Sequence, residues 1–581
     1  INKKQKTDSA IGKLLAQKGL AEIQIKQDID QCIFKARMYK IRFQFSEAMK
    51  NYELAIRSDT TNYANMDEFA YLLLQLRQYD RAIELYSRLL NELRVLAVND
   101  PAIYEPAIAN YLDDLSSLYE EKNDFKKATD FSEESLEIRR RFDDKKNFIV
   151  RYKSELALTL NNRGTLYFKN NDFDNAEQAL SESLEIRRQL SEVDSVYTEP
   201  DLAVSLHNMG LLYFSRRDYK KSEVFHLEAL KIRRRLAYNN PLLYDQDLAQ
   251  SLENTGLLYT RKKDGFKQAE GFLRESLDIY SRLAEKNPYT YEAFKAEVLG
   301  NWGKLCEDNK DFERALTLYL QSSSIYTTLS ENVPQVYEPT LSKIFNNIGN
   351  IYSQINDSST AIEFYRESLK IAIHLARQNA QAYEPALAQI LKNLGRFYHD
   401  RRDFVNAADL YLQSLEIYTR LAKADPQTFE SLQALVLDYL GTLYANKSDP
   451  KTGEKFWKEC AEIRLRLYDK YHDEYKNSLV RALDAYCTAL YLQGKFFELE
   501  KISQIGIKVD DTYPFFKQDL ATALLFQGRF EDAKKEFLLI KDLSDDKGHF
   551  LKKGILIDLD VLEKKGFTHP DVPKIRELLM E

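Results

Sequence analysis

One sequence motif recurs along almost the whole chain of 581 residues. Three of its copies read LNNRGTLYFKNNDFDNAEQAL from Leu160, LHNMGLLYFSRRDYKKSEVFH from Leu206 and LKNLGRFYHDRRDFVNAADLY from Leu391. Each copy has a Leu, a Gly four residues later and a Tyr three residues after the Gly. A motif that returns at a near-constant period predicts a chain of stacked units, each of which buries its apolar face against its neighbours.

Twelve units are found when the Gly position is taken as the anchor of each copy. Successive anchors are separated by 34, 46, 48, 46, 46, 47, 46, 46, 46, 46 and 34 residues. In most units a second small residue follows the anchor by twelve positions, as at Ala176 and Ala361. The anchors are Ala36, Ala70, Ser116, Gly164, Gly210, Gly256, Gly303, Gly349, Gly395, Gly441, Cys487 and Ala521.

This pattern resembles the tetratricopeptide repeat family, whose consensus places L-G-x-x-Y and a later small residue within about 34 residues. The 46-residue spacing resembles the long repeats of kinesin-light-chain-like bacterial proteins. The resemblance implies an all-α fold, a right-handed superhelical α-solenoid of about twelve helix-turn-helix units. In each unit helix A carries the anchor and helix B follows it.

The ninth unit predicts where its two helices begin and end. Pro385 suits the first position of helix A, which is predicted over 385–402. Asp403 is a candidate N-cap for helix B, which is predicted over 404–424, and Pro426 prevents its continuation. The extra length of the long units is expected to divide equally, with roughly six more residues in each helix than in a 34-residue repeat.

The repeats also predict the organisation of the chain, because 19 Gly and 13 Pro are few for a series of globular domains with linkers. We expect a polar N-terminal capping segment over 1–28 and two short units over 29–103. Long units are expected over 104–474, degenerate units over 475–547 and capping helices over 548–581.

Composition narrows the possible partners. The net charge of −7 argues against electrostatic binding to nucleic acid or an anionic membrane. No stretch approaches the ~20 apolar residues that span a bilayer. Four widely spaced Cys without a CxxC pair favour a reducing cytoplasm. The chain begins at Ile1 rather than Met, so the sequence leaves open whether the protein has a leader or a further domain.

No catalytic motif is present, and no cofactor or metal is predicted. The chain has no GxxxxGK[ST], HExxH or GxSxG sequence, and no pair of its seven His has metal-ligand spacing. Cys306, Cys460 and Cys487 fall in packing positions of the repeat. The sequence therefore predicts a protein without enzymatic activity, although a site assembled from carboxylates of different repeats stays open.

Two residues before the anchor, Asn recurs in six successive units. An Asn side chain offers both a hydrogen-bond donor and an acceptor, which matches the backbone of an extended peptide. The resemblance implies that this face of helix A lines a groove in which such a row binds peptide. The alternative is that these Asn side chains only support helix contacts. The asparagine row consists of Asn162, Asn208, Asn254, Asn301, Asn347 and Asn393.

Side chains beside the asparagine row are predicted to select the peptide sequence. They include His207, Asn346 and Lys392, each one residue before the row or its equivalent, and Arg396 one helical turn after it. The carboxylate clamp of small tetratricopeptide domains does not fit this chain, because Tyr439 stands where the next unit would need Asn.

Arginine gathers near the end of helix B in three successive units. One interpretation is that these residues complement the helix dipole and pair with Glu137 and Glu185 of the same helices. The other is a basic patch that binds an acidic partner segment or a phosphate group. The candidate patch consists of Arg139, Arg140, Arg187, Arg188, Arg233 and Arg234, with Arg141 and Arg235 beside it.

The sequence thus predicts a scaffold that binds a protein or peptide partner in the helix A groove through the asparagine row. The alternative is a recognition module of a larger signalling or defence protein that binds a folded partner. The sequence does not determine the oligomeric state.

Overall fold

The computed structural model describes residues 23–580, except 43, 60–61, 144–148, 194 and 544–550. These residues form helices joined by short turns, and no strand occurs among them. The chain divides into two compact units, residues 1–336 and 337–581. Most of the predicted N-terminal segment 1–28 lies outside the described residues, and only its end, from 23, belongs to a described helix that runs to 41.

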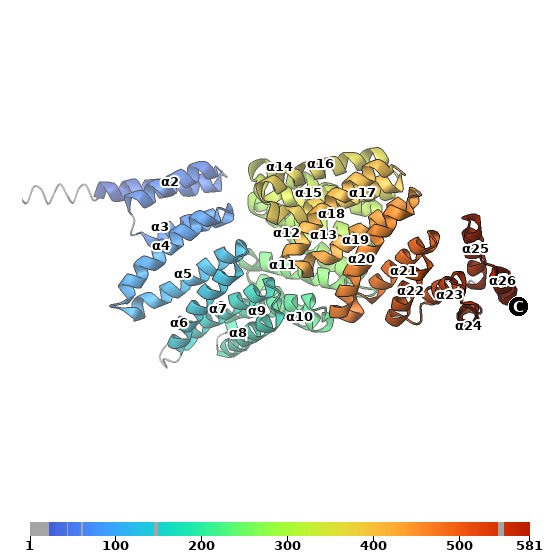
Figure 1. Cartoon of the computed structure of the whole chain (residues 1–581). Helices are drawn as coiled ribbons and strands as arrows, with labels where there is room; N and C mark the ends of the chain where they lie inside the picture. The colour runs from blue at the N-terminus through green and yellow to red at the C-terminus, as the bar shows by residue number, and fades with distance from the viewer. Residues whose placement is uncertain are drawn as a thin grey trace, which may run out of the picture. The chain divides into compact units, whose positions relative to one another are not determined.

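The first compact unit is a succession of helical hairpins in which each helix packs against the next in the chain (Figure 1). After the helix over 23–41, its helices are α2 (Phe45–Ser58), α3 (Tyr63–Gln75), α4 (Tyr79–Ala97), α5 (Pro101–Glu121), α6 (Phe125–Asp143), α7 (Ile149–Lys169), α8 (Phe173–Val193), α9 (Ser195–Ser215), α10 (Tyr219–Asn239), α11 (Pro241–Tyr259), α12 (Phe266–Lys286), α13 (Pro288–Asp308) and α14 (Phe312–Asn332).

The second compact unit continues the same hairpin pattern, and the division between the units falls in the first turn of α15. Its helices are α15 (Pro334–Gln354), α16 (Ser358–Gln378), α17 (Ala380–Asp400), α18 (Phe404–Ala424), α19 (Pro426–Asn446), α20 (Pro450–Tyr471), the 3-10 helix η1 (His472–Glu474), α21 (Lys476–Leu492), α22 (Phe496–Val509), α23 (Pro514–Phe526), α24 (Phe530–Ile540), α25 (Leu551–Lys564) and α26 (Val572–Met580).

Helix A of the ninth unit begins five residues earlier than the sequence predicted. The side chain of Asn379 accepts a hydrogen bond from the backbone N–H of Ala382 and caps α17. Pro385 therefore lies inside the helix, where it removes one main-chain hydrogen bond, and not at the first position. The prediction was wrong because Asn is a strong N-cap and the junction after α16 needs only this one residue.

Both helices of a long repeat are extended, as the sequence predicted. Helix B has 21 residues in α18 and 14 in α22 of a short repeat, a difference of seven residues or about 10 Å. Helix A has 21 residues in α17 and 17 in α21 of that short repeat. Asp403 is the predicted N-cap of α18, since its side chain accepts a hydrogen bond from the backbone N–H of Asn406.

Among the described residues, the turn between helices A and B has the same form in eight repeats. One residue other than Gly adopts the left-handed conformation, as Arg402 does with φ of 61°. The backbone N–H of Asp403 then donates to the carbonyl oxygen of Tyr398 at 3.0 Å, which closes the end of α17. This turn fixes the direction in which helix B leaves helix A.

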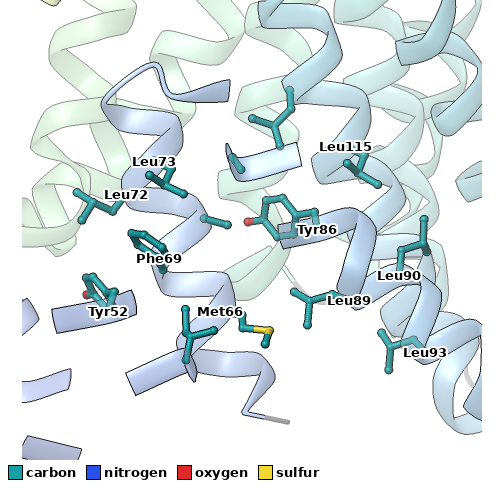
Figure 2. Close-up of a cluster of buried hydrophobic side chains, with 14 of the residues drawn as sticks. Tyr52, Met66, Phe69, Leu72, Leu73, Tyr86, Leu89, Leu90, Leu93 and Leu115 are labelled. Carbon is teal, nitrogen blue, oxygen red and sulfur yellow. The ribbon is translucent and has the colours of Figure 1, made fainter. Parts of the chain in front are cut away.

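The anchor residue allows close packing between helices A and B. A Cβ atom added to Gly395 would lie 2.7 Å from a ring carbon of Tyr411, sixteen residues later. Tyr365 and Tyr319 stand in the same relation to Gly349 and Gly303. Near the N-terminus, the residue sixteen after the anchor Ala36 is Tyr52 of α2, which Figure 2 shows beside Phe69 of α3; their rings stack at 5.4 Å between centroids. The small anchor is therefore a packing requirement.

Candidate functional site

The six Asn side chains of the asparagine row lie on helices α7, α9, α11, α13, α15 and α17 and are all half-buried. Three of them connect neighbouring repeats. The Nδ2 group of Asn208 donates to Oδ1 of Asn161 at 2.9 Å, and that of Asn393 donates to Oδ1 of Asn346 at 3.1 Å.

The third connection has the same register but a different acceptor. Nδ2 of Asn301 donates to Oε1 of Glu253 at 2.7 Å. In each case the row residue of one repeat bonds to the residue that precedes the row in the repeat before it. We call this preceding residue the acceptor position. These bonds give the asparagine row a structural role, and they leave each amide with one further N–H for other partners.

The remaining members of the row are arranged differently. Asn254 donates to the carbonyl oxygen of Gln250 in its own helix at 3.0 Å. Asn162 lines a cleft of about 510 Å³ in the first compact unit, together with the predicted neighbours Asp113, Ser117 and Thr165. At this place the structure brings the row and its neighbours together around open space.

The predicted specificity residues divide between buried and accessible positions. His207 and Asn346 are buried, so they contact helices within the repeats. Burial and the charge of Arg233 lower the pKa of His207 well below its usual value, which keeps the ring neutral near pH 7. His226 packs edge-on against it at 5.4 Å between centroids.

Lys392 and Arg396 remain the accessible cationic residues beside the row. Lys392 is half-buried and donates from Nζ to Oε1 of Gln389 at 3.1 Å, while Arg396 is exposed. Burial and the nearby Arg396 charge lower the pKa of Lys392 to about 8. Neither residue forms an ion pair with a carboxylate in the described part of the chain.

The six arginines of the candidate basic patch do not share one surface. Arg139, Arg187 and Arg233 are buried, which corrects the prediction of a common patch. Arg140, Arg188 and Arg234 are exposed and pair with glutamates of helix B in the following repeat. These pairs are Arg140–Glu182 at 3.2 Å, Arg188–Glu228 at 3.0 Å and Arg234–Glu275 at 2.6 Å.

The buried arginines join helix B to the next helix A. Arg233 donates to the carbonyl oxygen of Asp247 at 3.0 Å and to Oγ of Ser251 at 2.7 Å. Arg187 makes the equivalent pair of bonds with Asp201 and Ser205. The sequence interpretation that the arginines pair with Glu137 and Glu185 of the same helices is therefore wrong, since their partners lie in the following repeat.

Sequence reasoning missed a group of carboxylates near the C-terminal end. Asp484 of α21 occupies an acceptor position and Asp519 of α23 occupies the row position of the next repeat. Asp558 of α25 interacts electrostatically with Asp519. The spacing from the anchors Cys487 and Ala521 marks the positions of Asp484 and Asp519, but neither position holds the recurring Asn.

Burial and mutual repulsion shape the charge of these carboxylates. The pKa of Asp519 is raised well above its usual value by burial, with Asp484 and Asp558 as further causes. Burial also raises the pKa of Asp484 and of Asp558. A related group of three aspartates lies in the first compact unit, where burial and the charges of Asp67 and Asp113 raise the pKa of Asp114 to about 7.

The described residues contain no group of His, Cys, Asp and Glu arranged to hold a metal ion. The four cysteines are unpaired thiols, and Cys306, Cys460 and Cys487 are buried among apolar side chains as the repeat predicted. Across the same residues, no helix combines the length and apolar character needed to cross a bilayer.

Hairpins that repeat along each compact unit define an α-solenoid, in which helices α7, α9, α11, α13, α15 and α17 carry the asparagine row. Sequence profiles described as tetratricopeptide repeat match residues 155–235, 342–372 and 390–425. The chain therefore contains tetratricopeptide repeats, and solenoids built from such repeats present extended surfaces suited to binding other proteins.

Several solved structures are similar to the chain. The crystal structure of BtubC (BKLC) from P. vanneervenii is 22% identical with a TM-score of 0.36, and the match covers 43% of this chain and 92% of that one. Yeast Tom70 is 14% identical with a TM-score of 0.36, covering 95% and 99%. The apo form of RapI is 13% identical with a TM-score of 0.39, covering 54% and 99%. No curated protein matches the sequence.

Proposed function

We propose that the chain is a non-enzymatic scaffold of the cytoplasm that binds an extended segment of a protein partner along its helix A face. The observation that carries this proposal is the asparagine row, held in register by bonds between helices such as Asn208 to Asn161. Asn208 and Asn301 each use one N–H in these bonds, so a second N–H and an acceptor oxygen remain for a peptide backbone.

The cleft beside Asn162 supports the same proposal. Its lining combines the hydroxyl groups of Ser117 and Thr165 with the carboxylate of Asp113, which suits a polar, extended ligand. Side chains that differ from repeat to repeat, including Lys392 and Arg396, would then distinguish one peptide sequence from another.

The test compares two double variants in affinity capture from a lysate, with the cross-linked residues located by mass spectrometry. Asn162→Ala/Asn254→Ala removes two row residues and keeps the three bonds between repeats. Arg188→Ala/Arg234→Ala is the matched control on helix B. We expect the first variant to lose at least about tenfold in partner affinity and the control to retain it, with cross-links on α7 and α11.

Capture that survives Asn162→Ala/Asn254→Ala, with cross-links confined to helices B, would contradict the proposal. The helical content of both variants is checked by circular dichroism, so that a loss of binding is not a loss of fold.

A second candidate is a recognition module that binds a folded partner, as part of a larger signalling or defence protein. Large apolar side chains at the junction of α10 and α11 favour it, because Tyr238, Leu242 and Leu243 are 89%, 83% and 61% exposed. Exposed apolar groups of this size at one place are typical of protein interfaces. Loss of partner capture in Tyr238→Ser/Leu242→Ser, with capture intact in Asn162→Ala/Asn254→Ala, would select this candidate.

A further inference from the structure

The C-terminal end of the helix A face lacks the donor that completes the asparagine row elsewhere. At three other junctions, an Asn amide donates to the acceptor position, as Asn393 does to Asn346. Between α21 and α23 these two positions hold Asp484 and Asp519, and burial raises the pKa of both carboxyl groups, so without a partner the donor between them is a proton that a carboxyl group retains. A cationic group from outside the pair would take the place of this proton and stabilise both ionised carboxylates.

The surrounding side chains do not supply a cation. No Lys or Arg forms an ion pair with Asp484, Asp519 or Asp558 in the described part of the chain. Their neighbours are neutral: Tyr513 hydrogen-bonds Asp484, Cys487 hydrogen-bonds Asp519, and Nε2 of Gln518 donates to Oδ2 of Asp558 at 2.6 Å. Asp484, Asp519 and Asp558 each keep part of their residue surface exposed to solvent.

A second observation, independent of the carboxylates, also indicates a missing donor. Gln518 is only 7% exposed, and its Oε1 atom is buried without a hydrogen-bond partner among the described residues. The same amide bonds Asp558 through Nε2, so Oε1 lies at this cluster as well. A buried amide oxygen without a donor is energetically unfavourable, because it has lost its hydrogen bonds to water.

We propose that Asp484, Asp519 and Asp558, with Oε1 of Gln518, form a pocket for the guanidinium or ammonium group of a basic partner segment. Such a group brings several N–H donors and a positive charge, which satisfies both the carboxylates and the amide oxygen. The inference rests on the proposed function and specifies it, because it gives the C-terminal part of the groove a preference for Arg or Lys.

Charge elsewhere in the second compact unit sets a direction for this segment. Lys392 and Arg396 on α17 are cationic, whereas the positions on α21, α23 and α25 are acidic. A segment bound along this unit therefore has acidic residues near α17 and basic residues near α21–α25.

The probe for this pocket is a fluorescein-labelled peptide of nine arginines, measured by fluorescence anisotropy with the full chain at low salt. We expect Asp519→Asn to weaken binding at least tenfold. The control, Asp511→Asn, removes the same charge at an exposed position between α22 and α23 and is expected to change affinity less than twofold. A peptide in which citrulline replaces arginine keeps the shape and loses the charge, and it is expected not to bind.

Equal effects of Asp519→Asn and Asp511→Asn would overturn the pocket, since the peptide would then respond only to net charge. Asp484→Asn provides a second variant, and circular dichroism establishes that both fold. Loss of peptide binding on addition of millimolar Mg²⁺ or Ca²⁺, dependent on Asp519, would assign the cluster to a metal ion instead. If partner capture depends on Asn162 and Asn254 while Asp519→Asn has no effect, the scaffold function stands and this pocket fails.

Discussion

Asn301 donates a hydrogen bond from Nδ2 to Oε1 of Glu253 across two neighbouring repeats, at 2.7 Å. Glu253 is buried, and burial together with the charge of Glu297 raises its pKa to about 8. The neutral acid is thus favoured in the fold although the free residue is ionised at pH 7.

This relationship predicts a stability that decreases with pH. The folded pKa lies above the unfolded pKa, so between about pH 4.5 and pH 8 the folded state holds a proton that the unfolded state has lost. Stability should fall by at most about 1.4 kcal/mol per pH unit in this window. Glu253→Gln keeps the acceptor oxygen and is expected to remove this slope, so that the variant melts higher than the wild type at pH 8. Identical melting curves for the two proteins at pH 5 and pH 8 would contradict the prediction.

The bonds within the asparagine row predict unequal effects of the same substitution. Asn208→Ala removes the donor to the buried Asn161 and is expected to cost about 1 kcal/mol. Asn254→Ala removes a bond within its own helix and is expected to cost less than about 0.5 kcal/mol. Hydrogen exchange of α7 and α9 measures the first effect locally, which suits a repeat chain whose parts open separately. Equal exchange in both variants would show that the bond between repeats adds no stability.

The adjacent Arg233 and Arg234 of α10 allow the same substitution to be compared at a buried and at an exposed position. Arg233→Ala removes two charged hydrogen bonds from a buried position and is expected to cost about 2–4 kcal/mol. Arg234→Ala removes an exposed ion pair with Glu275 and should cost below about 1 kcal/mol. Thermal melting and hydrogen exchange of α10 and α11 distinguish them, and a larger loss for Arg234→Ala would refute the assignment. High salt should lower the stability of the wild type only by the contribution of the exposed Arg234–Glu275 ion pair, because the buried bonds of Arg233 are screened much less.

An anchor glycine and a glycine outside the anchor position predict opposite signs for the same substitution. Gly395→Ala forces a methyl group against Tyr411 and is expected to cost about 1–3 kcal/mol. Gly271→Ala on α12 meets nothing within 4 Å and is expected to gain about 0.5–1 kcal/mol from helix propensity. The melting temperatures of the two variants, each compared with the wild type, measure both effects. A Gly395→Ala protein as stable as the wild type would contradict the first prediction and mean that Tyr411 moves aside at little cost in free energy.

The sequence predicted the hairpins because their determinants are local. The spacing of Leu391, Gly395 and Tyr398 along one helix face, and Asp403 as a cap, require no knowledge of neighbouring repeats. The predicted start of helix A was wrong because Pro385 and Asn379, six residues earlier, are both signals for the start of a helix.

The site was less predictable because its contacts cross repeats. Asn208 and Asn161 are 47 residues apart, and only the stacking of α7 and α9 brings them together. In the same way, the sequence does not distinguish Arg233 from Arg234, which are adjacent residues of the same type. Successive residues of α10 point in different directions around the helix, so Arg233 is buried and Arg234 is exposed. The asparagine row as a peptide site stays a prediction.

Neighbouring repeats are joined through two rows of contacts that respond to ions in different ways. Neutral bonds such as Asn208 to Asn161 join helices A, whereas exposed ion pairs such as Arg188 to Glu228 join helices B. Dissolved salt screens the second row and leaves the first almost unchanged. Ionic strength therefore acts on the angle between successive hairpins, so the curvature along each compact unit, and with it the length of segment that fits against helices A, varies with the salt around the protein.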